Sequence, residues 1–216
     1  MDRPLAVAFL VSGEGTTLDA LAAQVADGTL PVRIVLVVAD REGAPALARA
    51  QRRGLPTRVL PRRTDAPEAW AAELTHELEA AGAELIVNAG FLSILPDGWV
   101  RRWAGRAINV HPSLLPRHGG RGMYGDRVYR AVLAAGDAET GATVHLVTSD
   151  VDRGPAVDRA RLPVVPGDTP ASLRARLHPV EVELLARTIR RFATGALPLP
   201  YRPRPAATPA DDERRP

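Results

Sequence analysis

Short apolar runs alternate with helical patterns through the first half of the chain, and this alternation constrains the fold more than any other feature. The runs span residues 5–11, 32–38, 57–60 and 85–89, and the helical patterns between them span 18–26, 45–53 and 67–81. Strands that alternate with helices form a parallel sheet covered by helices. Because the first two runs are almost continuously apolar, their strands are expected to be buried on both faces.

The second half continues this pattern and then changes it. A strand is expected over 106–110, a helix over 126–135, and a long strand with alternating apolar positions over 140–148. Residues 159–164 are expected to pair beside that strand, which gives the sheet a mixed edge. Thr169 and Pro170 form a typical helix start for a last helix that ends near residue 194. The predicted fold is an open, twisted and mostly parallel α/β sheet, Rossmann-like, with helices on both faces and a mixed edge.

With 216 residues, the chain is long enough for one domain with a large core. We expect this domain to span residues 1–196, and the segment 197–216, rich in proline and charge, to be a mobile tail. No run of about 18 apolar residues and no signal segment occur, so we expect a cytoplasmic protein without a membrane span.

Composition argues against two classes of partner. The formal net charge is only +3, and all 28 basic residues are arginines, spread along the chain in pairs rather than in one block. We therefore expect no nucleic-acid partner. The chain has no cysteine, and its five histidines show no metal-ligand spacing, so we expect no metal.

The first apolar run ends in the turn SGEGTTL, residues 12–18. Glycine permits a tight turn there, and the following helix presents free backbone N–H groups that suit an anion. Asp40 ends the second run, where a dinucleotide-binding domain carries a ribose-binding acid, but Leu18 occupies the position of that motif's third glycine. The turn alone is equally compatible with an ordinary strand-to-helix connection.

The segment NVHPSLLP, residues 109–116, directly follows a predicted strand. Asn109 and His111 therefore lie at the carboxyl edge of the sheet, with both side chains on the same side. An imidazolium and a carboxamide can both donate hydrogen bonds to a carbonyl oxygen that becomes negative, as in acyl transfer. The competing interpretation is a loop histidine that caps local backbone.

A carboxylate follows the long predicted strand, in the segment SDVDRGP, residues 149–155. Asp152 near His111 would raise the pKa of the imidazole, keep it protonated near neutral pH, and relay a proton through water. Asp150 is an equal candidate on residue chemistry alone, and either could be a turn aspartate.

Taken together, these segments resemble the folate-dependent formyltransferase family over residues 5–194. The resemblance is carried by SGEGTT, AGFLSIL, NVHPSLLP, GATVHLV with VDRGP, and PVVPGDT. It implies transfer of a formyl group from 10-formyltetrahydrofolate, a co-substrate, to an amine without a metal. It also implies that Asn109, His111 and Asp152 are catalytic, with Asp152 rather than Asp150 as the family aspartate.

The resemblance also assigns the substrate sites. The substrate phosphate would be held by Gly15, Thr16 and Thr17, and the ribonucleotide would be contacted by Glu181, whose alternative role is a solvent-facing glutamate at the helix border. The folate would be bound by Leu92, Ser93, Ile94, Leu95 and Asn109. Glu14 and Thr17 stand where asparagines are typical, and an acid beside a phosphate is unfavourable unless its side chain turns outward. The loop 117–127, rich in glycine, is expected to be a mobile lid near the folate.

The chain is most similar to the one-domain branch of purine biosynthesis, whose acceptor is the amine of glycinamide ribonucleotide. An amino-sugar nucleotide as acceptor, or hydrolysis of 10-formyltetrahydrofolate by a deformylase, would use the same three catalytic residues. A non-catalytic nucleotide-binding Rossmann module is the alternative of a different class. In each case we expect small-molecule substrates and a monomer or homodimer.

Overall fold

Two neighbouring strands, over residues 5–11 and 32–39, carry apolar side chains at nearly every position because helices cover both of their faces. β1 (Leu5–Val11) pairs in parallel with β2 (Val32–Ala39) on one side and with β4 (Leu85–Asn88) on the other. Every β1 residue after Leu5 is buried. The prediction of parallel strands covered on both faces is confirmed.

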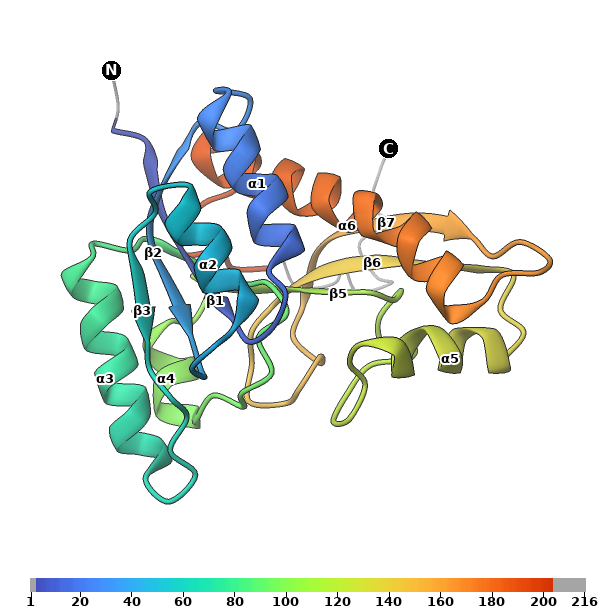
Figure 1. Cartoon of the computed structure of the whole chain (residues 1–216), viewed down its shortest axis with the longest axis horizontal. Helices are drawn as coiled ribbons and strands as arrows, with labels where there is room; N and C mark the ends of the chain where they lie inside the picture. The colour runs from blue at the N-terminus through green and yellow to red at the C-terminus, as the bar shows by residue number, and fades with distance from the viewer. Residues whose placement is uncertain (1–2, 204–216) are drawn as a thin grey trace, which may run out of the picture.

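The computed structural model describes residues 3–203 and places seven strands in one sheet, in the order β3-β2-β1-β4-β5-β6-β7 (Figure 1). The other strands are β3 (Thr57–Val59), β5 (Ala107–His111), β6 (Glu139–Leu146) and β7 (Ala156–Pro163). The helices are α1 (Thr16–Ala26), α2 (Pro45–Arg52), α3 (Pro67–Ala80), α4 (Asp97–Arg102), α5 (Asp126–Ala134) and α6 (Pro170–Ala193).

The predicted mixed edge is present and begins at β6. β5 is parallel to β4, whereas β6 is antiparallel to both β5 and β7. The register sets Asn109 opposite His145 and His111 opposite Thr143. The site-bearing end of β5 therefore lies beside the middle of β6, a relation that chain order alone does not give.

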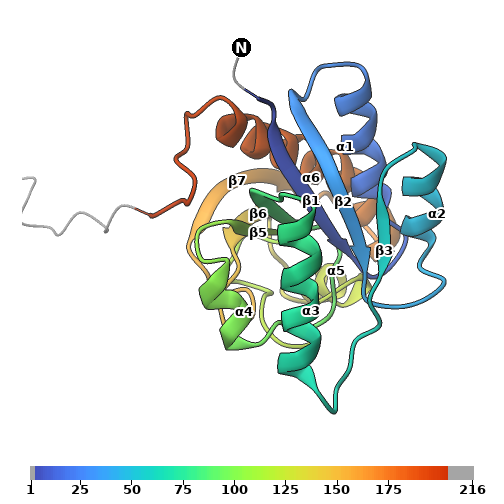
Figure 2. The same cartoon turned by 90° about the vertical axis from the view of Figure 1, so that its left-hand side faces the viewer.

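Two hydrophobic clusters fill the space between the sheet and its helical layers. One contains Leu21 of α1, Leu47 of α2 and Leu185 of α6, and the other contains Leu74 of α3 and Trp99 of α4. Figure 2 shows α3 and α4 on one side of the sheet and α1 and α2 on the other. Burial on both faces provides the main apolar stabilisation of the fold.

The last helix begins as the sequence predicts. The hydroxyl of Thr169 accepts a hydrogen bond from the backbone N–H of Ser172, the hydroxyl of Ser172 accepts one from the N–H of Thr169, and Pro170 is the first helical residue. This reciprocal cap satisfies two backbone donors that the first turn leaves free. It fixes the start of α6, the helix that carries Glu181 to the cavity described below.

The segment after α6 differs from the expected mobile tail in its first residues. Leu197 is buried in the core, the backbone N–H of Tyr201 donates to the carbonyl of Gly105 at 2.8 Å, and the Tyr201 ring packs edge-on against Phe192. Apolar side chains in this proline-rich stretch cover the core edge, so the domain extends beyond residue 196. The remainder of the predicted tail, 204–216, lies outside the described residues.

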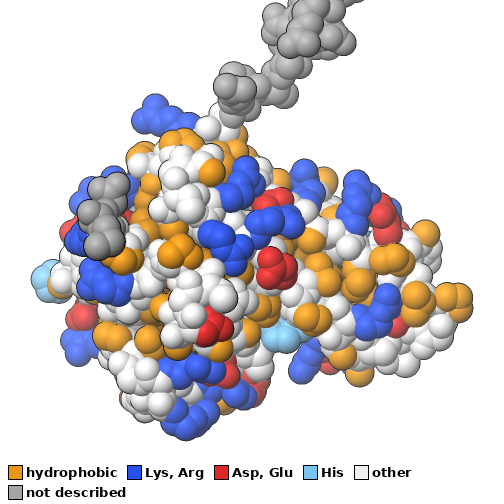
Figure 3. Space-filling model, turned by 90° about the horizontal axis from the view of Figure 1, so that it is seen from above, with side chains coloured by type: hydrophobic (Ala, Val, Ile, Leu, Met, Phe, Trp, Pro, Cys, Tyr) orange, Lys and Arg blue, Asp and Glu red, His pale blue; other side chains and the backbone are white. Residues whose placement is uncertain are grey.

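Arginines are dispersed over the surface rather than gathered in one block. On the face seen in Figure 3, basic side chains lie among acidic and apolar ones. Many arginines of the described residues form ion pairs, such as Arg187 with Asp158 at 3.0 Å. Among residues 3–203, no helix combines the length and apolar character that crossing a membrane requires. Within the same range, no group of three or more His, Asp or Glu side chains could hold a metal ion.

Candidate active site

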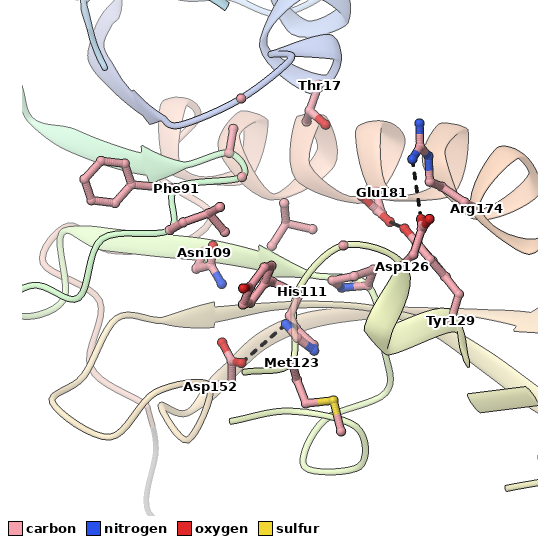
Figure 4. A pocket seen from close by; sticks show the side chains of 18 of the residues that line it. Thr17, Phe91, Asn109, His111, Met123, Asp126, Tyr129, Asp152, Arg174 and Glu181 are labelled. Atoms are coloured by element: carbon pink, nitrogen blue, oxygen red, sulfur yellow. Dashed lines mark hydrogen bonds and ion pairs between the residues drawn. The ribbon is translucent and has the colours of Figure 1, made fainter. Parts of the chain in front are cut away.

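A cavity of about 890 Å³ opens at the carboxyl edge of the parallel strands. Its wall brings together predicted residues that are up to 166 positions apart in the chain, from Gly15 to Glu181. The predicted residues in the wall are Gly15, Thr16, Thr17, Leu92, Ile94, Asn109, His111, Asp152 and Glu181. Figure 4 shows Asn109, His111 and Asp152 grouped together, with Thr17 and Glu181 farther along the cavity.

His145 fixes the amide of Asn109, a contact that sequence reasoning missed. The Asn109 side-chain nitrogen lies 3.0 Å from Nε2 of His145, and Nδ1 of His145 lies 2.9 Å from the carbonyl of Leu146. A carbonyl can only accept, so Nδ1 carries the proton and Nε2 accepts from Asn109. The alternating pattern of residues 140–148 offered a signal, but only the strand register pairs His145 with Asn109.

His111 has an acceptor beside each ring nitrogen. Nε2 lies 2.8 Å from the carbonyl oxygen of His118, and Nδ1 lies 3.5 Å from Oδ2 of Asp152. The ring is only 4% exposed, so the proton on Nε2 is directed at a protein carbonyl rather than at water. This geometry identifies His111 as a donor through Nε2 and leaves Nδ1 facing a carboxylate.

The pKa of His111 corrects the sequence prediction. Burial lowers the pKa of this imidazole below its usual value, although Asp152 and the carbonyl of His118 both act to raise it. Burial outweighs these partners because the cationic ring loses its hydration. The direction of this shift favours the neutral ring at neutral pH over the imidazolium that a neighbouring aspartate was expected to maintain.

Asp152 is held in place by a backbone N–H of the loop 117–125 and lies beside two histidine rings. Its Oδ2 accepts from the backbone N–H of Gly120 at 2.9 Å, and its Oδ1 lies 3.6 Å from Nε2 of His145. Burial acts to raise the pKa of Asp152, but His145, His111 and the Gly120 N–H together lower it. Asp150, in contrast, is exposed and lies outside the cavity wall.

Residues 117–125 of the loop predicted to be a lid, 117–127, lie beside this group, and α5 begins at Asp126. The first residues of the loop are tied to one carboxylate: Nε2 of His118 lies 2.6 Å from Asp137, and Arg117 forms a 2.5 Å ion pair with the same side chain. The His118 carbonyl is thereby directed at His111, and the Gly120 N–H at Asp152. The loop is thus bonded to both catalytic candidates.

The turn after β1 forms the opposite end of the cavity. Gly15 has φ 69°, and a Cβ on it would lie 2.5 Å from Cβ of Ala46, so the close approach of α2 requires glycine. The side chain of Glu14 is mostly exposed and forms a 3.8 Å ion pair with Arg49, whose Nε also donates to the Glu14 carbonyl. The acid beside the anion cradle therefore turns toward an arginine that sequence reasoning missed.

Glu181 lies on α6, and its side chain points into the cavity rather than into the solvent. Its carboxylate accepts from the hydroxyl of Tyr129 at 3.4 Å, and burial raises the pKa of Glu181 to about 7. Burial and the negative charge of Glu181 also raise the pKa of Tyr129. Next to this pair, Arg174 lies 3.5 Å from Asp126 (Figure 4). These contacts join α5 to α6 across the cavity.

Apart from Asn109, the four residues predicted to bind folate separate into two groups. Leu92 and Ile94 expose apolar side chains at the cavity, which suits a flat aromatic ligand. Ser93 and Leu95 are buried and lie outside the wall, because the Ser93 hydroxyl bonds to Asp40 and Leu95 packs in the core under α3 and α4. The sequence did not identify Met123, which also lines the cavity.

The comparisons with known proteins agree with this geometry. Residues 5–189 match a protein family described as formyl transferase. The phosphoribosylglycinamide formyltransferase of Escherichia coli is 34% identical over 192 residues, which cover 88% of each chain. The trifunctional purine biosynthetic protein adenosine-3 of Drosophila pseudoobscura pseudoobscura is 40% identical over 88% of this chain, but the chain spans only 14% of that relative's length.

Solved structures show the same arrangement of strands and helices. A phosphoribosylglycinamide formyltransferase from Coxiella burnetii superposes with a TM-score of 0.84 and 36% identity, covering 90% of each chain. A formyltetrahydrofolate deformylase from Burkholderia mallei superposes with a TM-score of 0.80 and 32% identity, covering 92% of this chain and 68% of that one.

Proposed function

The chain belongs to the formyl transferase family, and on that premise we propose that it transfers the formyl group of 10-formyltetrahydrofolate to the amine of glycinamide ribonucleotide. This is the phosphoribosylglycinamide formyltransferase step of purine (IMP) biosynthesis. The observation that carries the proposal is that Asn109, His111 and Asp152 share one cavity with the Gly15–Thr17 turn. A reactive amine and an anion on the same small molecule could occupy both ends at once.

The acceptor would lie between the turn and α6. Backbone N–H groups at the start of α1, with Thr16 and Thr17, would bind its phosphate. Glu181 would accept hydrogen bonds from the ribose hydroxyls, with Tyr129 bonded to its carboxylate. The ion pair between Glu14 and Arg49 supports this placement, because it offsets a negative charge that would otherwise repel the phosphate.

The folate would lie along the opposite wall. Its ring system would pack on Leu92 and Ile94, which are exposed at the cavity. Ser93 and Leu95 would support that wall from behind rather than touch the ligand. The formyl carbon would then lie beside Asn109 and His111, within reach of the acceptor amine.

The chemistry follows from the protonation states of these groups. The acceptor amine forms a bond to the formyl carbon, and negative charge develops on the formyl oxygen. The Nε2–H of His111 and the second N–H of the Asn109 amide donate to that oxygen. The C–N bond to the folate then breaks, the acceptor nitrogen loses a proton, and the folate nitrogen gains one. Asp152 and Nδ1 of His111 carry that proton between the two nitrogens.

Asp152 would act mainly on the charged form of His111. A carboxylate 3.5 Å from Nδ1 stabilises the imidazolium that forms when the ring takes up the proton. The neutral form of His111 suits this role, since only a neutral imidazole can accept a proton. The formyl oxygen would also have to replace the His118 carbonyl as the acceptor at Nε2, which requires a small displacement of loop 117–125.

The test follows tetrahydrofolate release from 10-formyltetrahydrofolate, with and without glycinamide ribonucleotide, in the wild type and in His111→Ala. We expect release that depends on the ribonucleotide and falls at least about 100-fold in the variant. Folate affinity should change much less, because His111 acts on charge that appears in the transition state.

The other outcomes assign the alternatives. Release that requires no acceptor would support hydrolysis, the reaction named for the Burkholderia mallei structure. Release only with an amino-sugar nucleotide would replace the purine assignment, and absence of release with every acceptor would exclude formyl transfer. We further propose that the enzyme works in the cytoplasm as a monomer or homodimer, which cell fractionation and analytical ultracentrifugation would check.

A further inference from the structure

Asp40 does not occupy the ribose-binding role that its position at the end of β2 suggested. Its side chain is buried, with the whole residue only 4% exposed, and it lies outside the wall of the cavity. A ligand hydroxyl therefore has no access to its carboxylate. Asp40 instead contacts two neighbouring loops that line the cavity, one after β1 and one after β4.

One oxygen of Asp40 joins both loops. Oδ2 accepts a hydrogen bond from the hydroxyl of Ser12 at 2.7 Å and another from the hydroxyl of Ser93 at 2.6 Å. Ser12 begins the turn that leads to Gly15, and Ser93 lies between Leu92 and Ile94. The remaining oxygen, Oδ1, lies 3.2 Å from Nε of Arg41 at the surface.

Two further hydrogen bonds join Ser12 to residues 90–93, which we call the folate-side loop. The Ser12 hydroxyl accepts from the backbone N–H of Leu92 at 2.8 Å, while the Ser12 N–H donates to the carbonyl of Gly90 at 3.2 Å. Because the hydroxyl proton points to Asp40, the lone pairs of the same oxygen are free to receive Leu92. Asp40 thus orients Ser12, and Ser12 in turn holds the backbone of Leu92.

These bonds matter most where regular secondary structure is absent. Leu92 and Ser93 belong to no helix or strand, so no ladder of backbone hydrogen bonds sets their conformation. Ser12 and Ser93 are 2% and 9% exposed, and buried hydroxyls need a partner. A carboxylate is a stronger acceptor than a neutral group and can receive both donors at once.

We propose that Asp40 is a positioning residue that sets the acceptor-side turn and the folate-side loop together, and so determines affinity for both substrates without touching either. The inference rests on the proposed function for the identity of the ligands. A purely structural role would lower stability alone, whereas a positioning role weakens binding in protein that is still folded.

The experiment measures separate dissociation constants for tetrahydrofolate and glycinamide ribonucleotide, with kcat and Tm, in Asp40→Ala, Asp40→Asn and Ser93→Ala. Asp65→Ala, which removes an exposed aspartate far from these contacts in sequence, is the matched control. Asp40→Ala should weaken both ligands about tenfold while kcat changes only a few-fold, because the catalytic groups stay in place. Asp40→Asn should recover most of the loss, since its amide oxygen can still accept from both serines.

Ser93→Ala tests separately one of the two hydrogen bonds that Oδ2 of Asp40 accepts. It removes only the folate-side hydroxyl, so it should weaken tetrahydrofolate and leave the ribonucleotide within about twofold. If Asp40→Ala does not fold, Ser93→Ala and Ser12→Ala decide the question, with Ser12→Ala expected to weaken both ligands.

Three results would overturn the inference: unchanged dissociation constants in a folded Asp40→Ala variant, weakening of only one ligand, or a loss confined to kcat. Failure of the proposed function is distinguishable from these, because the wild type itself would then not bind glycinamide ribonucleotide. Wild-type binding of both ligands with equal binding by the Asp40 variants would reject the positioning role alone.

Discussion

At the scale of single residues, the chemistry depends on which acceptor each donor meets. Asn109 is fixed by His145, His111 by the His118 carbonyl and Asp152, and Asp152 by the Gly120 N–H. Each group therefore has a defined direction before a ligand arrives. Such preorganised donors stabilise developing charge once the small displacement of loop 117–125 has freed Nε2 of His111, and this is the largest catalytic effect expected of the site.

The two neighbouring aspartates provide a matched pair of variants. Asp152→Asn keeps an acceptor for the Gly120 N–H but removes the charge beside His111, so kcat should fall by about 100-fold or more. Asp150→Asn changes an exposed turn residue and should keep kcat within about twofold. Steady-state kinetics of both variants, with circular dichroism to verify folding, would check this. Equal losses in both would show that Asp152 has no special role.

At the scale of secondary-structure elements, packing of α5 against α6 buries the carboxyl of Glu181 in the wall of the cavity. Ionising a buried carboxyl costs free energy because the charge loses its hydration. Burial raises the pKa of Glu181 from 4.5 to about 7, so the folded protein holds this proton more tightly than the unfolded chain does. The resulting contribution to stability is fully present below pH 4.5 and is lost as the pH rises through about 7. We expect the ionised glutamate above this pH to be tolerated because of the binding role proposed for Glu181.

Glu181→Gln should therefore be more stable than the wild type at about pH 8, by at most about 3 kcal/mol, and the difference should disappear toward about pH 4.5. The same variant should raise the KM for glycinamide ribonucleotide, because an amide is a weaker acceptor than a carboxylate. Thermal unfolding across this pH range would measure the first effect. Glu183→Gln, on an exposed face of the same helix, is the control, and a pH-independent difference for Glu181→Gln would contradict the assignment.

At the scale of the whole molecule, the cavity lies where the parallel half of the sheet meets its antiparallel edge. The Gly15–Thr17 turn and Leu92 come from the first half, while Asn109, Asp152 and Glu181 come from β5 onward. A ligand that fills the cavity would contact both halves. Its binding energy therefore adds to the stability of the folded state as a whole.

Tetrahydrofolate and glycinamide ribonucleotide should each raise Tm. At ligand concentrations of about 100 times the dissociation constant, the added stability is about 2.7 kcal/mol, which corresponds to a shift of roughly 5–10 °C for a domain of this size. His111→Ala should show nearly the same shift, because the histidine contributes to the transition state rather than to ground-state binding. Differential scanning fluorimetry would test this, and a shift lost in the variant would assign His111 to binding.

Local patterns in the sequence predict the secondary-structure elements and the residue types that short segments carry to the cavity. Continuous apolar runs predicted the buried parallel strands, the Thr169 cap predicted the start of α6, and NVHPSLLP predicted that Asn109 and His111 lie at the sheet edge, because these properties depend on residues adjacent in the chain. Packing between distant segments brings His145 to Asn109 and Asp40 to two loops that line the cavity. The same packing buries His111 and so lowers its pKa. Register and desolvation arise from packing between segments, and no local pattern contains them.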